Sequence, residues 1–97
     1  MEKKKKKTQI CIVTVTGADR VGIIAKLANI MAKVNVNIVD VNQKIMEDYF
    51  VMTMAVDIAG ATVSIEKIRG QLDKAGRQLA LKITLQDENI FKAMHRI

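Results

Sequence analysis

Residues 14–27 read TVTGADRVGIIAKL, and in this stretch a strand pattern changes into a helical one across a short polar turn. Val13 and Val15 alternate with threonines, which is typical of a half-buried strand, and from Ile24 onward the apolar residues recur three and four positions apart. A strand that ends at a helix N-terminus leaves backbone N–H groups without intrahelical partners, next to the positive end of the helix dipole. We therefore expect a carboxylate or phosphate to bind at this turn.

The strand and helix on either side of the turn extend outward from it. Residues 9–16 are predicted to form a strand that is apolar on both faces, which indicates a central position in a sheet. Asp19 is predicted to cap the following helix, which ends near Asn35 because asparagine tolerates the left-handed conformation. The expected buried stripe of that helix is Ile24, Leu27, Ala28, Met31 and Val34.

Composition limits the chain to one domain. It has 97 residues, of which 49% are hydrophobic, and a formal net charge of +6. Lys3 to Lys7 supply five of the positive charges, so residues 1–8 are expected to be a disordered basic tail on a nearly balanced domain. The single Cys11 excludes a disulfide framework and falls in the first strand, where it is expected to be a buried apolar residue. Neither a signal peptide nor a membrane-spanning run is recognisable, so we expect a cytoplasmic protein with no membrane partner.

Two strands, residues 38–46 and 49–58, are predicted to form a hairpin about Glu47-Asp48. If they pair antiparallel so that the numbers of opposite residues sum to 95, Ile45 faces Phe50, Val41 faces Met54 and Val39 faces Val56. Gln43 is the only polar residue on that face. This register predicts one buried and one open face, with a loop that can be longer than two residues because Glu-Asp is not a strong tight-turn dipeptide.

The remaining chain predicts a helix, a strand and a terminal helix. Thr62 or Ser64 can cap the second helix, whose stripe is Ile65, Ile68, Leu72 and Ala75, and Gly76 marks its expected end. A strand with Leu79, Leu81, Ile83 and Leu85 on one face follows, and Asp87 then caps a short helix with Ile90, Phe91, Met94 and Ile97. The domains are therefore 1–8, the basic tail; 9–86, the folded unit; and 87–97, the C-terminal helix.

This order of elements predicts an α+β fold, the ferredoxin-like βαββαβ sandwich. It is a four-stranded antiparallel sheet with two helices on one face, followed by the short C-terminal helix. The other face is left bare and is partly apolar. We expect the terminal helix or a second subunit to cover it, and we expect a homodimer. The bare face would carry Ile10, Ile12, Thr14, Thr16, Asp40, Asn42, Lys44, Val51, Thr53 and Ala55.

Residues 17–25, GADRVGIIA, followed by a helix and then by Val36-Asn37-Ile38, resemble the ACT domain family of amino-acid-sensing modules. The resemblance covers about residues 9 to 86, with its specific part in 16–40, and the length is similar to that of stand-alone single-ACT-domain proteins. Val21 stands where the family usually has proline, which pre-sets φ in the first helical turn. The resemblance implies a non-catalytic regulatory module that binds an amino acid at a homodimer interface and acts on a metabolic enzyme or regulator.

The resemblance also implies a ligand site. Its residues would be Asp19, Arg20, Gly22, Ile23 and Asn37. Asp19 would accept from the ligand's ammonium group, helix N–H groups near Gly22 and Ile23 would hold its carboxylate, and Asn37 would reach across from the other subunit. Each of these residues also has a structural interpretation: Asp19 as a cap, Gly22 as a packing position, Asn37 as a helix stop and Arg20 as a solvated charge.

Other functions find less support in the sequence. His95 is the only histidine, no Cys/His cluster has metal-ligand spacing, and no catalytic triad can be assembled, so we expect neither an enzyme nor a cofactor or metal. An acylphosphatase-type hydrolase would need a more basic loop than one with Arg20 beside Asp19.

Two alternatives stay open: an interaction module without a ligand, and an RNA-binding ferredoxin-like domain. The RNA hypothesis is weakened because Tyr49, Phe50 and Phe91 do not form a stacking platform on two central strands.

Overall fold

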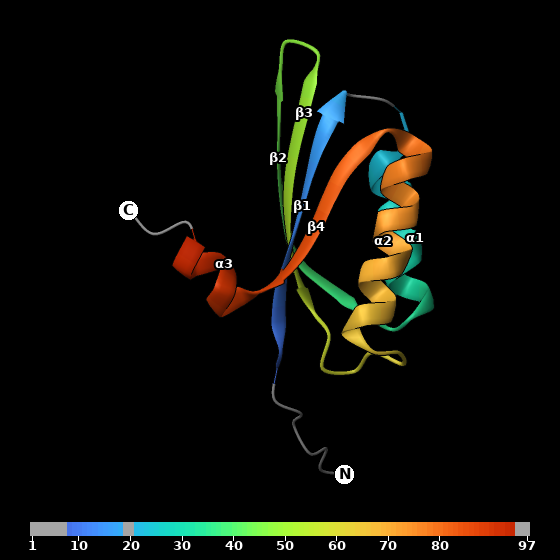
Figure 1. Ribbon diagram of the computed structural model, residues 1–97, viewed down its shortest axis with the longest axis vertical. Helices are drawn as coiled ribbons and strands as arrows, with labels where there is room; N and C mark the ends of the chain where they lie inside the picture. The colour runs from blue at the N-terminus through green and yellow to red at the C-terminus, as the bar shows by residue number, and fades with distance from the viewer. Residues whose placement is uncertain (1–7, 19–20, 95–97) are drawn as a thin grey trace.

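The computed structural model describes residues 8–18 and 21–94. Within these ranges the chain forms a four-stranded antiparallel sheet with two long helices on one face and a short helix on the other (Figure 1). The βαββαβ order with a terminal helix is confirmed. The predicted basic tail, residues 1–8, lies outside the described residues except for Thr8, and Asp19, Arg20 and His95 also lie outside them.

The strands are β1 Ile10–Ala18, β2 Asn37–Met46, β3 Tyr49–Asp57 and β4 Leu81–Asp87. They have the order β2-β3-β1-β4 in the sheet, so β1 and β3 are central and β2 and β4 are edges. Period-two alternation defines its buried face, which lies under the helices and carries Cys11, Val13 and Val15 of β1. The helices are α1 Ile23–Lys33, α2 Ile65–Leu79 and α3 Glu88–Met94.

The β2–β3 hairpin has the predicted register over most of its length. Ile45 faces Phe50, Gln43 faces Met52 and Val41 faces Met54, and the turn consists of Glu47 and Asp48, with Glu47 at φ 60°. The pairing of Val39 with Val56 is wrong. The register shifts between Ile38 and Asp40, so Ile38 faces Val56 instead. An extra residue in one strand has this effect, because two residues then oppose one on the partner strand.

The two strands of the hairpin differ in burial. On β3, Phe50, Met52, Met54 and Val56 are buried as predicted. On β2 the expected burial is wrong: Val41 is 41% exposed and Ile45 is 54% exposed. As an edge strand, β2 extends beyond the cover that the helices provide.

The observed start of α1 differs from the prediction. The N-cap of α1 is Gly22, not Asp19, and it makes no side-chain cap hydrogen bond. The helix starts at Ile23, so the stripe includes buried Ile23 in place of Ile24, which is 41% exposed. Asn35 at φ 60° follows the helix as predicted.

The second helix is capped by Ser64, whose hydroxyl accepts the N–H of Lys67 at 3.2 Å. It runs past Gly76 to Leu79 and ends at Ala80, which adopts the left-handed conformation at φ 56°. The predictions that Gly76 ends the helix and that Leu79 belongs to the following strand are therefore wrong. Leu81, Ile83 and Leu85 form the buried face of β4 as predicted.

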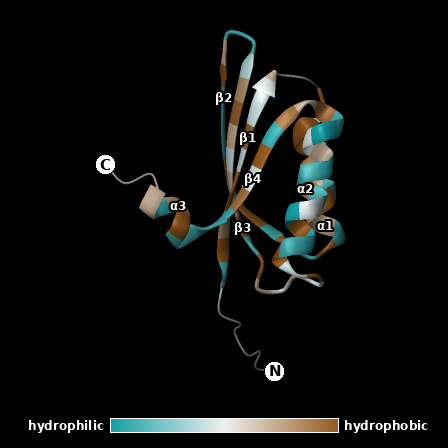
Figure 2. Cartoon of the chain, viewed as in Figure 1, coloured by the Kyte–Doolittle hydropathy of each residue, from teal (hydrophilic) through white to brown (hydrophobic). Residues whose placement is uncertain are grey.

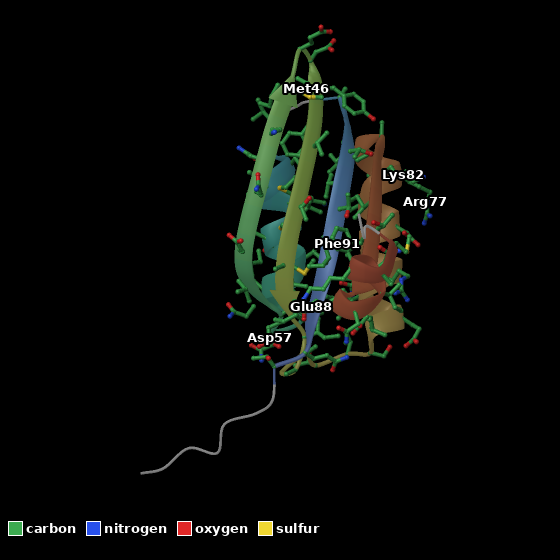
Figure 3. The ribbon with its side chains drawn as sticks, turned by 90° about the vertical axis from the view of Figure 1, so that its left-hand side faces the viewer. Met46, Asp57, Arg77, Lys82, Glu88 and Phe91 are labelled. Atoms are coloured by element: carbon green, nitrogen blue, oxygen red, sulfur yellow. The ribbon has the colours of Figure 1, made fainter. Side chains whose placement is uncertain are left out.

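The short helix α3 lies across the sheet face that α1 and α2 leave open, in contact with β1 and β4 (Figures 1 and 3). Asp87 accepts the N–H of Asn89 at 2.9 Å, which confirms the predicted cap. Ile90 and Met94 stay exposed, so α3 covers this face only in part.

Candidate functional site

A groove of about 300 Å³ lies between the N-terminus of α1 and the hairpin end of β2. Its helix side is formed by residues 22–25, and its sheet side by Gln43, Ile45 and Phe50. Phe50 is buried and Ile45 is largely exposed, so the groove passes from the core to an open rim. A cavity of this size holds a small ligand.

The helix side of the groove is built by the second half of residues 14–27, where the strand pattern has given way to the helix. Gly22 has φ 92°, a left-handed conformation that glycine adopts without steric cost, and α1 starts immediately after it. The first intrahelical bond there runs from the N–H of Lys26 to the carbonyl of Gly22 at 2.9 Å. The preceding N–H groups of Ile23, Ile24 and Ala25 therefore have no intrahelical acceptor, and the first turn contains no acidic residue. This end of the helix can accommodate a carboxylate.

Two of the five predicted site residues, Gly22 and Ile23, line this groove. Asp19 and Arg20 lie outside the described residues. Within one chain Asn37 is not brought to the groove. It starts β2, whereas the groove lies where β2 ends, and Figure 3 shows Met46 and Asp57, the neighbours of these two ends, far apart along the sheet.

The bulge at Val39 also affects Asn37. Because of the register shift, Asn37 faces Asp57, which itself faces Ile10 on the sheet face away from the helices. Asn37 lines a different depression of about 380 Å³ with Asn35 and Gly60. There the Asn35 amide donates to the Gly60 carbonyl at 2.9 Å and fixes the loop after β3.

Gln43 is a groove residue that the resemblance did not single out. Its signal in the sequence is that it is the one polar residue on the otherwise apolar face of the hairpin. In the structure it faces buried Met52, and its exposed amide forms no hydrogen bond within the described ranges. It can therefore supply a donor and an acceptor to a bound ligand.

The outer edge of β2 has no neighbouring strand in the described part of the chain. Next to it, Val39 is 55% exposed, and Val41 and Ile45 are also open to solvent. Exposed edge strands with apolar side chains pair readily with another strand. The groove and this unpaired edge are contiguous, because Gln43 and Ile45 belong to both.

Titratable groups give little support to catalysis. Burial, followed by the charge of Asp87, raises the pKa of the Cys11 thiol, while Arg69 opposes the shift. A fully buried thiol with a raised pKa is a poor nucleophile. Backbone N–H groups of Gln9 and Ala59, each at 3.0 Å, lower the pKa of Asp57, which stabilises the start of β1 and the loop after β3.

Residues 8–18 and 21–94 contain no group of three or more histidine, cysteine or acidic side chains arranged to hold a metal ion. Within the same ranges, none of the helices has the length and hydropathy of a membrane-spanning segment.

Comparison with known proteins gives consistent results over nearly the whole chain. A model described as ACT domain matches residues 9–86. A UPF0237 protein of Clostridium acetobutylicum is 44% identical over 86 residues, which cover 89% of this chain and 97% of that protein. A UPF0237 protein of Methanocaldococcus jannaschii is also 44% identical over 86 residues, covering 89% of this chain and 96% of that protein.

Among solved structures, an ACT domain protein from Streptococcus pneumoniae superimposes on this chain with a TM-score of 0.75. It is 30% identical, and the superposition covers 92% of this chain and 100% of that one.

Proposed function

This chain belongs to the ACT domain family, whose members are regulatory and often bind amino acids, and on that premise we propose that it is a non-catalytic regulatory module that binds an amino acid at a homodimer interface. The observation that carries the proposal is the contiguity of the groove with the unpaired β2 edge. A ligand there would touch both the helix N-terminus and a strand that a second subunit can pair with. We place the protein in the cytoplasm, acting on a metabolic enzyme or regulator.

The groove supplies chemically distinct partners for an amino acid. The free N–H groups at the start of α1 suit the α-carboxylate. We assign the ammonium group to Asp19, with Arg20 at the rim, because both precede Gly22 in the chain. Gln43 can bind either polar group, and Ile45 with Phe50 offers an apolar surface to the side chain.

The dimer that we propose pairs β2 with β2 of the partner, antiparallel and centred on Asn42. In this arrangement each Lys44 lies opposite Asp40 of the partner subunit, so two cross-strand pairs of opposite charge form on one face. On the other face the exposed Val41 and Ile45 lose contact with water, which favours association. The pairing also removes the exposed edge.

The same pairing gives Asn37 a role that it does not have in one chain. Because the strands run antiparallel, the start of the partner's β2 lies beside the end of this β2, where Ile45 borders the groove. Asn37 of the partner subunit would then lie at the groove's rim. We assign it to the rim and not to the floor, because the bulge directs it toward the other sheet face.

A thermal-shift screen of the twenty amino acids tests this proposal. At least one should raise the Tm, because a ligand that binds only the native state stabilises it by about 2.7 kcal/mol at a hundred times its Kd. In a domain of this size each kcal/mol raises the Tm by about 4–8 °C. Gln43→Ala should reduce the shift, whereas Gln9→Ala, which removes an exposed glutamine side chain far from the groove, should leave it intact.

An absence of any shift in a folded dimer would refute amino-acid binding and favour an interaction module without a ligand. An equal shift in wild type and Gln43→Ala would refute this groove as the site.

A further inference from the structure

A second groove lies on the opposite side of the molecule from the open sheet face, between α1 and α2. Its volume is about 380 Å³. The helices are antiparallel and present matching faces to it, since residues 26, 30 and 33 of α1, and 71, 74 and 78 of α2, are three or four positions apart. None of its lining residues lines the groove beside the N-terminus of α1, which we call the amino-acid groove.

The floor of this groove is apolar and its rim is basic. Val34 and Ala75 are buried and Ile30 is packed against the core, so together they form the floor. Three exposed lysines, Lys26, Lys33 and Lys74, stand around it with Gln71 and Gln78. No acidic residue lines it.

The three lysines lack a counter-charge in the described part of the chain. There the ion pair is Lys92 with Glu88, on the far side of the sheet. Helix α1 contains no acidic residue. On α2, Asp73 lines grooves against β4 on another side of the helix, away from the lysines. Together the two helices carry six basic and two acidic side chains, and hydrophilic colour covers much of α2 in Figure 2.

We propose that the groove between α1 and α2 binds an acidic, amphipathic peptide segment of a partner protein. Carboxylates of the segment would pair with Lys26, Lys33 and Lys74, and its apolar side chains would pack on Ile30 and Ala75. The lysine positions follow the length of the helix pair, which suits an extended or helical segment more than a single small anion. Nucleic acid fits less well, because its phosphates would gain nothing from the apolar floor.

This site does not depend on the amino-acid site. It gives a regulatory module a surface for its target on the helical layer, and it stays open if two subunits pair through β2, because its residues lie on the outer side of the helices.

The test uses the full-length protein and a fluorescein-labelled peptide of four Leu-Glu-Glu repeats, with binding followed by fluorescence anisotropy. At about 0.15 M salt the Debye length is about 8 Å, so diffuse attraction by Lys3 to Lys7 is largely screened. The triple variant Lys26→Glu, Lys33→Glu and Lys74→Glu should weaken binding at least about tenfold, because like charges then face each other. The control is Lys67→Glu, Arg77→Glu and Lys82→Glu, which changes the net charge equally at exposed positions outside the groove and should bind nearly as wild type.

Two further probes distinguish binding in this groove from non-specific attraction of anions to a basic protein. Four Ser-Glu-Glu repeats should bind much more weakly than Leu-Glu-Glu, and a single-stranded oligouridine should not compete. Amide NMR shifts on wild-type protein, which need no variant to fold, should concentrate in residues 26–34 and 71–78. Equal losses in both triple variants, equal binding of the serine peptide, competition by the oligouridine, or shifts spread outside the helices would overturn the proposal.

Discussion

Gly70 and Gly76 lie in the same helix, but a methyl group added to each meets different surroundings. At Gly76 a Cβ atom would lie 2.7 Å from the carbonyl oxygen of Leu81, a backbone atom of β4 that cannot move without disturbing the strand. At Gly70 nothing lies within 4 Å. Gly76 is therefore required for close packing of α2 on the sheet, not for ending the helix.

Gly76→Ala should therefore destabilise the fold by about 1–3 kcal/mol, as overpacking does. Gly70→Ala is the matched control and should stabilise it by about 0.5–1 kcal/mol, because alanine loses less backbone entropy in a helix. Urea unfolding measures both. If both variants change stability in the same direction, the contact of Gly76 with Leu81 does not govern this helix.

Asp57 links the start of β1 to the loop after β3 through two accepted N–H bonds, which lower its pKa below the ordinary 3.8. Because the folded-state pKa is lower than the unfolded one, its contribution to stability is fully present above the ordinary value. It is lost as the pH falls through the folded-state pKa. Asp57→Asn should thus lower the Tm by a few degrees at pH 7, and this difference should shrink below about pH 4.

Calorimetry between pH 7 and pH 2.5 tests the prediction for Asp57. Asp48→Asn, in the hairpin turn, is the control, since that side chain is exposed and no hydrogen bond to it is seen within the described ranges. A Tm difference for Asp57→Asn that is constant with pH would mean that the carboxylate charge does not matter there.

Among the elements, β2 is the edge strand whose outer side has no neighbouring strand in the described part of one chain. If two copies pair about Asn42, Lys44→Asp should repel Asp40 of the partner and weaken the dimer, and Asp40→Lys should do the same against Lys44. The double variant restores opposite charges and should recover the dimer. Each cross-strand charge pair contributes about 0.2–1 kcal/mol, and the dimer contains two, so the dissociation constant should change by about two-fold to thirty-fold.

Sedimentation equilibrium measures this cycle, and circular dichroism checks that each variant keeps the fold. Lys82→Asp is the matched control, because Lys82 lies on the same sheet face but on β4, the other edge. Single and double variants with the same dissociation constant would exclude this register.

The hairpin and the helix caps differ in how well the sequence predicts them. The hairpin register was predictable because a period of two and a short turn fix it. The bulge at Val39 was not, since Ile38 and Val39 are both apolar and either suits the core face. The cap at Ser64 was predictable from local chemistry. The cap of α1 was not, because Asp19 and Gly22 both suit a helix start and only the backbone conformation distinguishes them.

Which residues are buried and which line the groove depends on the order of the strands in the sheet, and local sequence patterns do not determine that order. Val41 and Ile45 have the pattern of core residues and are exposed because β2 is an edge. Gly22 and Ile23 could be placed at a groove from the helix start alone, but Gln43 needed the fold to bring it there. The lysine-rimmed groove between the helices could not be predicted either, because its lining residues come from two segments that are distant in the sequence.

At the scale of the whole molecule, the two grooves lie on different surfaces and depend on different assemblies. The amino-acid groove borders the β2 edge, so in our proposal it is completed only in the dimer. The groove between α1 and α2 is complete in one chain. A variant that separates the subunits without unfolding them should therefore affect one function and spare the other.

Val41→Lys is such a variant, because Val41 is 41% exposed on the edge strand and a charge that points inward at an edge opposes strand pairing. We expect a folded monomer that loses the amino-acid thermal shift and binds the Leu-Glu-Glu peptide within about twofold of wild type. Ile90→Lys adds the same charge at an exposed apolar residue of α3, away from β2 and from both grooves; it is the control and should remain dimeric. A monomeric Val41→Lys protein that still responds to the amino acid would show that the groove needs no partner subunit, whereas loss of peptide binding together with the dimer would show that the two surfaces are coupled.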